Sequence, residues 1–314
     1  MKAIVFNHKG TPDKLVLQEV EKPIHLENEV LVKIHAVSVN AADYRSMQLG
    51  IVPKKKIYGS DVAGVVEAVG NNVKNLRIGD AILGDLSASG SGGFAEYVTA
   101  PESALAIKPS IVSFEDAAAI PMAAVTALQA LRDQGKIQTG QKVLVYGSGG
   151  GVGTFAVQLA KIFGAQVTAV CSAKNVEQAH TLGADHVIDY SKTDALAINT
   201  KFDLIVAVNG SRSLTDYKKA LVSGGRFILV GGSLSQIIKT LLFGSILSIG
   251  GKKIQVLSAK PNSEDLEFII KLVEDGKIKP IIDRRYQLQE TSDAIKYLEQ
   301  GHARGKVVIS VNQQ

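Results

Sequence analysis

A glycine-rich turn between an apolar run and an amphipathic run constrains this sequence more than any other feature. The apolar run Val143–Tyr146 predicts a strand, residues 147–153 read GSGGGVG, and Val152–Phe163 predicts a helix. This arrangement brings bare backbone N–H groups and a helix N-terminus close to a phosphate. The alternative is a tight turn that binds nothing. The residues expected to contact a bound dinucleotide are Gly147, Gly149, Gly150, Gly151 and Val152.

The spacing of the glycines narrows the class of nucleotide. Gly147, Gly150 and Gly153 follow a GxxGxxG spacing, one residue longer than the first step of GxGxxG. The GxxxxGK[ST] pattern of mononucleotide-binding loops is absent. A glycine turn of this kind indicates dinucleotide binding when it lies between a strand and a helix, as it does here.

From about residue 139, short apolar strands alternate with helices, which predicts an α/β domain with a doubly wound parallel sheet. Glycine follows the predicted helices at Gly164 and Gly183, as helix ends favour. The further strands are expected at Gln166–Val170, Val187–Ile188, Leu204–Val208 and Arg226–Val230, and the further helices at Val176–Leu182 and Leu214–Leu221.

The rest of the chain has a different pattern, and its 314 residues favour two domains. Residues 1 to about 110 are mostly β, a helix begins after Ser113, and another is expected over Val125–Gln134. The strands are expected at Ala3–Phe6, Leu15–Val20, Glu29–Ser38, Gly64–Val69, Ala81–Leu83 and Phe94–Val98. After residue 262 we expect helices at Ser263–Glu274 and Ser292–Glu299 and a strand at Lys306–Val311.

Composition excludes several classes of protein. No run of about 18 apolar residues indicates a spanning helix, and Met1–Phe6 resembles a first strand more than a signal peptide. The lone Cys171 excludes an intrachain disulfide and a cysteine-rich zinc site. The net charge of +5 comes with only one basic triplet, Lys54–Lys56, which does not favour nucleic-acid binding. We expect a cytoplasmic enzyme.

The end of the second predicted strand indicates which dinucleotide binds. NAD sites usually place a carboxylate there for the ribose hydroxyls. Here Ser172, Lys174 and Asn175 follow the strand, and a hydroxyl and an ammonium suit a 2′-phosphate. Tyr190, after the third strand, adds another donor. We therefore expect NADPH, although Lys174 also fits an ordinary solvated lysine at a helix start.

Several further motifs extend over essentially the whole chain. They are Val39–Tyr44 (VNAADY), Gly59–Val66 (GSDVAGVV), Arg77–Asp80 (RIGD), Gly93–Tyr97 (GFAEY), Ala124–Ala127 (AVTA), Leu182–Asp185 (LGAD) and Arg304–Val308 (RGKVV). With the glycine turn, they make the chain similar to the zinc-independent quinone oxidoreductase (zeta-crystallin-like) branch of the medium-chain dehydrogenases/reductases. The resemblance implies a GroES-like β-rich catalytic domain, residues 1–122 and 262–314, and a Rossmann NADP-binding domain, residues 123–261. It places the active site between them.

The resemblance also shows where this chain departs from the zinc enzymes of the superfamily. Asn40, Ser60 and Met122 stand where those enzymes have Cys, His and Cys as catalytic zinc ligands, and zinc prefers thiolate, imidazole or carboxylate. The four-cysteine structural lobe is missing, and the six histidines show no ligand spacing. We expect no metal.

Without a Lewis acid, reduction of a quinone or an α,β-unsaturated carbonyl is easier than alcohol–carbonyl interconversion. Tyr44 is the candidate proton donor beside Asn40 as a neutral dipole, and protonation by water is the alternative. Asp43 and Asp61 are expected to bond loop backbone, and Arg45 suits either a cofactor phosphate or the surface. The resemblance adds Thr126 to the cofactor contacts. Further candidates are Gly231, which with Gly232 lets backbone approach the nicotinamide, and Lys306.

Two other functions remain open: a non-catalytic NADPH-binding protein of the crystallin type, with RNA as a partner, and an enoyl-thioester reductase. A short-chain reductase is excluded because no tyrosine has a lysine four residues later. The resemblance implies a homodimer or homotetramer, with Lys252–Leu257 as the edge strand that joins subunits. Loops at Gln48–Lys56 and Gln236–Ile249 are expected to shape the substrate pocket.

Overall fold

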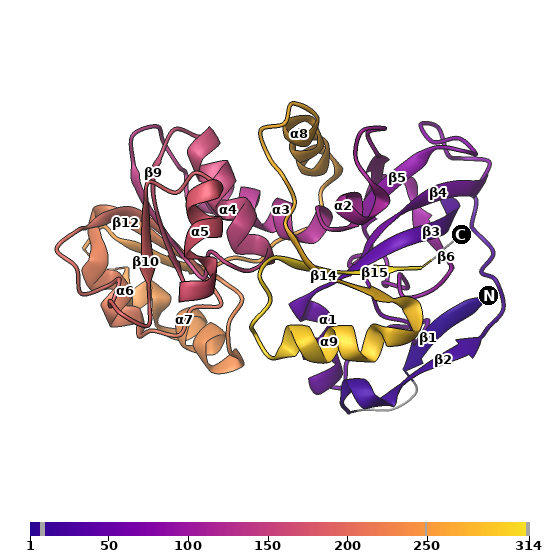
Figure 1. Ribbon diagram of the computed structural model, residues 1–314, viewed down its shortest axis with the longest axis horizontal. Helices are drawn as coiled ribbons and strands as arrows, with labels where there is room; N and C mark the ends of the chain where they lie inside the picture. Colours follow the sequence, from indigo (N-terminus) through magenta and orange to yellow (C-terminus); the bar gives the residue numbers. More distant parts are fainter. Residues whose placement is uncertain (7–9, 249, 312–314) are drawn as a thin grey trace. The chain divides into compact units, whose positions relative to one another are not determined.

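The computed structural model describes residues 1–6, 10–248 and 250–311, and the chain divides into two compact units (Figure 1). Unit 1 comprises Met1–Val125, Lys260–Gly276 and Pro280–Gln314, and unit 2 comprises Thr126–Ala259 and Lys277–Lys279. In the described part of the chain, no helix is both long and apolar enough to cross a bilayer.

Unit 1 is built on a mainly antiparallel sheet whose described strands run in the order β14-β15-β3-β4-β5-β7, with β6 also paired to β3. The strand β3 is the centre of this sheet, and its β-branched residues are buried along most of its length. The strands are β3 (Glu29–Val39), β4 (Asp61–Val69), β5 (Ala81–Asp85), β6 (Tyr97–Pro101), β7 (Leu105–Ile107), β14 (Ile282–Gln287) and β15 (Lys306–Ser310). A separate hairpin pairs β1 (Lys2–Phe6) with β2 (Leu15–Glu19).

The helices of unit 1 begin where the sequence supplies caps. Ser113 accepts a hydrogen bond from the Asp116 N–H (3.0 Å) and Asn262 accepts one from the Asp265 N–H (2.9 Å). These caps begin α2 (Phe114–Ala118) and α8 (Ser263–Glu274), and the unit also contains α1 (Ala41–Gln48) and α9 (Thr291–Glu299). Short 3-10 turns cover Pro12–Lys14, Glu102–Ala104 and Leu288–Glu290.

Unit 2 is a parallel sheet in the order β10-β9-β8-β11-β12-β13. Its strands are β8 (Lys142–Tyr146), β9 (Gln166–Cys171), β10 (His186–Asp189), β11 (Phe202–Val208), β12 (Leu221–Val230) and β13 (Lys253–Val256). Its helices are α4 (Gly151–Ile162), α5 (Val176–Thr181), α6 (Leu214–Ala220) and α7 (Leu234–Leu247), with a 3-10 turn at Ala173–Asn175.

The strand order in unit 2 determines where a ligand can bind. The chain winds outward from β8 to β10 and then returns to β11 beside β8, so the direction of winding reverses between β8 and β11. Right-handed crossovers place α4 and α5 on one face of the sheet and α6 and α7 on the other (Figure 1). Ligands bind at the carboxyl ends of strands next to such a reversal.

The doubly wound α/β class is confirmed, and the following local expectations are wrong. Residues Gln236–Leu247 belong to helix α7 and form no loop, while Ile249 lies outside the described residues. Helix α3 begins at Pro121, because proline is favoured at the first helical position, and ends at Leu128. A π-helical segment, Gln129–Gln134, continues it. Helix α1 and strand β14 were not expected, since neither has a clear apolar period.

Candidate active site and cofactor site

The glycine turn of unit 2 is shaped by close backbone approaches. Gly147 has a φ of +82°, and a Cβ there would lie 2.1 Å from the Val208 carbonyl oxygen. A Cβ at Gly153 would lie 2.2 Å from the Gly147 carbonyl oxygen. Both contacts are shorter than any tolerated by a side chain, so these two positions require glycine for the fold itself.

Gly150 differs because a Cβ there would meet nothing within 4 Å. It precedes α4 in an extended conformation (φ −89°, ψ 180°), and no side chain caps the helix. The first intrahelical bond runs from the Thr154 N–H to the Gly150 carbonyl (2.9 Å), which leaves the N–H groups of Gly151 and Val152 without helical partners. Open space beside an uncapped helix N-terminus fits a diphosphate.

The predicted 2′-phosphate residues gather at two neighbouring strand ends. Cys171 ends β9 beside Asp189 of β10, and the Tyr190 N–H donates to the Cys171 carbonyl (3.0 Å). Ser172 and Tyr190 are therefore neighbours, and the Tyr190 side chain is 55% exposed. Lys174 is exposed in the adjacent 3-10 turn. The structure thus gathers one hydroxyl, one phenol and one ammonium at this edge.

Asn175 and Asp189 complete the same edge. Asn175 is buried under the glycine turn, since a Cβ at Gly149 would lie 2.1 Å from its Nδ2. Asp189 was not anticipated, although a carboxylate directly after an apolar strand was a usable signal. Its Oδ1 accepts from the Ser191 hydroxyl (2.8 Å) and N–H (3.0 Å), which lowers the pKa of this carboxyl. Its Oδ2 is buried and has no partner among the described residues.

The ends of β11 and β12 also lie on the ligand-binding edge. Gly231 (φ +69°) and Gly232 (φ +116°) follow β12, and Asn209 follows β11 in the left-handed region at φ +58°. The Asn209 N–H donates to the Val230 carbonyl (3.1 Å), which ties the two ends together. Thr126 is half-buried on α3.

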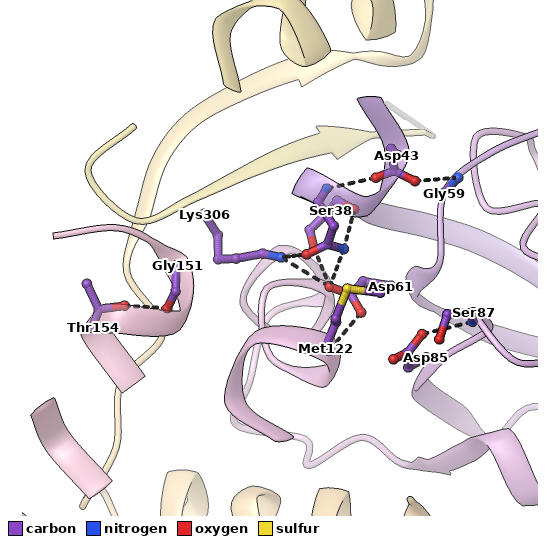
Figure 2. A network of polar contacts seen from close by, with 11 residues as sticks. Ser38, Asp43, Gly59, Asp61, Asp85, Ser87, Met122, Gly151, Thr154 and Lys306 are labelled. Atoms are coloured by element: carbon purple, nitrogen blue, oxygen red, sulfur yellow. Dashed lines mark hydrogen bonds and ion pairs between the residues drawn. The ribbon is translucent and has the colours of Figure 1, made fainter. Parts of the chain in front are cut away.

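A buried polar network surrounds Asp61 in unit 1 (Figure 2), and it contains Asn40, one of the two expected catalytic residues. Asp61 is fully buried at the start of β4. Its Oδ2 accepts from Ser38 Oγ (2.9 Å), Asn40 Nδ2 (2.8 Å) and Lys306 Nζ (3.1 Å). Its Oδ1 accepts from the Met122 N–H (2.9 Å), in the first turn of α3. Asp61 therefore links four separate elements of the chain through one carboxylate.

Two further carboxyls in unit 1 are buried. Asp43 accepts from the N–H groups of Asn40 (2.8 Å) and Gly59 (3.3 Å), which confirms its expected role on loop backbone. Desolvation raises the pKa of Asp43 to about 7, against the lowering effect of these two bonds. Desolvation, with the nearby charge of Asp61, raises the pKa of Asp85 to about 6.

The predicted catalytic residues have distinct environments. The Asn40 amide is buried and bonded within the protein, since its Oδ1 accepts from Lys306 Nζ (2.6 Å) and its Nδ2 donates to Asp61. Tyr44, on α1, is half-buried against the unit 1 core, and the Arg45 guanidinium lies 5.7 Å from its ring centroid. The Lys306 ammonium, only 3% exposed, points to Asp61 and Asn40 and not to solvent.

The positions that match zinc ligands elsewhere hold weak donors for zinc. The Ser60 hydroxyl lies 3.1 Å from that of Ser91, and the Met122 and Asn40 contacts are those of the Asp61 network. Across residues 1–6, 10–248 and 250–311, no three His, Cys, Asp or Glu side chains are grouped as metal ligands. Cys171 is buried at the end of β9, and burial raises the pKa of its thiol.

Comparisons with known proteins agree with both units. Residues 26–110 match the alcohol dehydrogenase GroES-like domain, and residues 182–309 match a family described as zinc-binding dehydrogenase. The chain is 35% identical to a chloroplast envelope quinone oxidoreductase homolog of Arabidopsis thaliana over 98% of both chains. It is 32% identical to an NADPH-dependent alkenal/one oxidoreductase, chloroplastic, of the same plant, over 98% of this chain and 79% of that protein.

A solved structure also shows similarity to a quinone oxidoreductase. The quinone oxidoreductase from Coxiella burnetii superposes with a TM-score of 0.89 at 32% identity, and the match covers 99% of each chain. The expected GroES-like unit is thereby confirmed alongside the Rossmann unit. The chain belongs to the zinc-independent quinone oxidoreductase family of the medium-chain dehydrogenases/reductases.

Proposed function

We propose that this protein is an NADPH-dependent reductase of quinones or α,β-unsaturated carbonyls that works without a metal. The observation that carries the proposal is the match, over 98% of the chain, to relatives named for quinone and alkenal/one oxidoreduction. The glycine turn and the weak zinc donors at Asn40, Ser60 and Met122 support it independently.

The residues of unit 2 fit NADPH by their chemistry. The N–H groups of Gly151 and Val152 at the start of α4 would hold the diphosphate, and Ser172, Lys174 and Tyr190 would hold the 2′-phosphate. Gly231 leaves room for the nicotinamide to approach the backbone, and Thr126 is a further predicted contact. When bound, NADPH supplies a hydride to the electron-poor carbon of the substrate.

The protein's own contribution is proton supply and orientation. Hydride addition leaves an enolate or quinol oxyanion, which takes one proton to complete the reduction. We assign this proton to the phenol of Tyr44. Asn40 acts as a positioning residue, because its backbone begins α1 and its amide is held by Lys306 and Asp61.

A substrate panel tests the activity. Purified protein is expected to oxidise NADPH with at least one member of a panel of quinones, enals and enones, followed by absorbance at 340 nm. Tight NADPH binding without turnover across the whole panel would contradict the reductase and favour a non-catalytic binding protein.

Substitution of Tyr44 tests the proton donor. Tyr44→Phe is expected to lower kcat by at least about tenfold while changing KM little, because general acid catalysis contributes on the order of 10² to 10⁴ in rate. An unchanged kcat and an unchanged solvent isotope effect would assign the proton to water.

Substitution of Lys174 tests the cofactor choice. Lys174→Ala is expected to raise the KM for NADPH about tenfold and to leave the KM for NADH within about twofold, because NADH lacks the 2′-phosphate. Lys142→Ala, an exposed lysine at the amino end of β8, is the matched control. Equal effects on both cofactors would contradict the assigned role.

We also propose a homodimer or homotetramer that forms through β13. This strand pairs with β12 on one side and is the last in its described sheet. On its outer side the Ile254 N–H is bonded to Ser248 Oγ (3.0 Å), and the Val256 N–H is left for pairing. Sedimentation velocity at micromolar concentration is expected to show the oligomer, and a monomer would contradict it.

A further inference from the structure

Unit 2 contains a cavity whose lining includes none of the residues assigned above to cofactor binding or proton transfer. It has a volume of about 530 Å³, within the usual range for small-molecule sites, and lies between residues 211–215 and helix α7. None of the glycine-turn residues lines it. Gln236 fixes one wall, because its Nε2 donates to the Arg212 carbonyl (2.8 Å) and joins α7 to the segment before α6.

The wall that helix α7 gives this cavity is largely apolar. Phe243, Ile246 and Leu247 of α7 line it with apolar surface, and Phe243 and Ile246 are 50% and 61% exposed. The apolar surface continues along α7 through Leu242, which is 64% exposed. A hydrocarbon chain would remove this surface from water, at about 25 cal/mol per Å² of apolar area.

The charged groups of the lining are all cationic. Arg212 and Lys239 are the charged residues among the ten that line the cavity, and none is acidic. Lys239 is exposed and has no ion-pair partner among the described residues. Arg212 forms an ion pair with Asp194 through one terminal nitrogen, while its Nε is buried with no partner in the described chain. The buried Nε does not reach the cavity, so Arg212 offers an anion the terminal N–H groups that Asp194 does not use.

We propose that this cavity binds a single-chain amphiphile with an anionic head group, such as a fatty carboxylate. The carboxylate binds at Arg212 and Lys239, and the hydrocarbon tail packs on Phe243, Ile246 and Leu247. This site goes beyond the reductase activity, because binding needs neither NADPH nor turnover.

Calorimetry on the full-length protein without NADPH tests the site with three probes. Decanoate combines the charge with the tail, 1-decanol has the tail alone and butyrate has the charge with a short tail. Decanoate is expected to bind once per chain, at least about fivefold more tightly than 1-decanol, and butyrate is expected to give no measurable heat. Equal affinity for decanoate and 1-decanol, or no binding of decanoate, would overturn the proposal.

Matched variants locate the binding. Lys239→Glu is expected to weaken decanoate binding at least about fivefold, because it replaces attraction with repulsion, and Phe243→Ser about tenfold. Lys142→Glu, at the amino end of the central strand β8, makes the same change in net charge and is expected to leave affinity within about twofold. Equal weakening by both lysine variants would overturn the site, as would competition between decanoate and NADPH. Circular dichroism confirms that each variant is folded.

Discussion

At the scale of single residues, the buried carboxylate of Asp61 has the largest effect on how the candidate site is arranged. Four donors from Ser38, Asn40, Lys306 and Met122 satisfy it, so the charge is tolerated at zero exposure. The arrangement fixes the Asn40 amide and the start of α1, which carries Tyr44. Asp61, which takes no direct part in the proposed reaction, thereby orients Asn40 and the helix that carries Tyr44.

Removal of Lys306 should leave the Asp61 charge uncompensated. Lys306→Met is expected to lower the free energy of unfolding by about 3 kcal/mol, as is usual when one partner of a buried pair is lost. The double variant Lys306→Met with Asp61→Asn should recover part of this loss. Urea denaturation of the single and double variants measures both. Equal losses in the two would mean that the Asp61 charge carries no penalty.

Asp43 should make stability depend on pH in an unusual direction. Its pKa of about 7 in the folded protein lies above the ordinary value of 3.8, so the native state binds more protons between these values. The contribution of Asp43 to stability is therefore greatest below about pH 4 and is lost as the pH rises through 7. Asp43→Asn should remove this loss.

We state this prediction as the difference in free energy of unfolding between Asp43→Asn and the unsubstituted protein. Between pH 4.5 and pH 7.5, the stability of Asp43→Asn relative to that protein should improve by about 3 kcal/mol, because the pKa of Asp43 is about 7 in the folded protein and 3.8 ordinarily. Urea titrations at the two pH values measure it. A relative stability that stays constant or worsens with rising pH would show that Asp43 is ionised throughout.

At the scale of elements, the strand–turn–helix from β8 to α4 serves both folding and binding. Gly147 and Gly153 permit the close backbone approaches that hold the turn, and Gly150 faces open space. The same run of glycines therefore contains two kinds of position. Gly147 and Gly153 are needed for the fold, and Gly150 is open to a ligand.

Two alanine substitutions should separate these roles. Gly150→Ala is expected to change stability by less than about 1 kcal/mol but to weaken NADPH binding at least about tenfold, because its Cβ enters the space predicted for the diphosphate. Gly147→Ala is expected to destabilise the protein by more than about 2 kcal/mol, because of its positive φ and the contact with Val208. Thermal unfolding measures the stability of the two variants, and NADPH titration measures their affinity for the cofactor. Unchanged affinity in Gly150→Ala would place the diphosphate elsewhere.

At the scale of the whole molecule, the outer side of β13 near Val256 is the expected site of assembly. The Leu257 N–H donates inward to Leu229 (2.9 Å), and the Ile254 N–H bonds to Ser248 Oγ (3.0 Å) on the other side. Since backbone donors alternate along a strand, the Val256 N–H points to the same outer side as that of Ile254. It is available to a second copy of the chain.

Val256→Pro should remove this outward donor and leave the bond from Leu257 to β12 in place. The expected result is a monomer in sedimentation velocity at a concentration where the unsubstituted protein is an oligomer. NADPH binding should persist, because the glycine turn is untouched. An oligomer of unchanged size would show that assembly uses another surface.

The sequence by itself determined the elements whose signals are local. Glycine spacing, the strand before it and the amphipathic run after it specify β8, the turn and α4, since positive φ and bare N–H groups depend on residue type. The serine before α2 and the glycines after α4 and α5 act in the same way. The residue motifs also indicated the family, and with it the cofactor and the weak zinc donors.

Only the tertiary structure decided which distant side chains meet. Lys306 was a candidate cofactor contact, yet β15 lies beside β3, and this pairing brings its ammonium to Asp61 and Asn40. Helix α7 carries apolar residues on its exposed side as well as its buried side, so it has no period that distinguishes a helix from a loop. Burial, long-range ion pairs and cavities depend on contacts between remote segments, and no local pattern of residues encodes them.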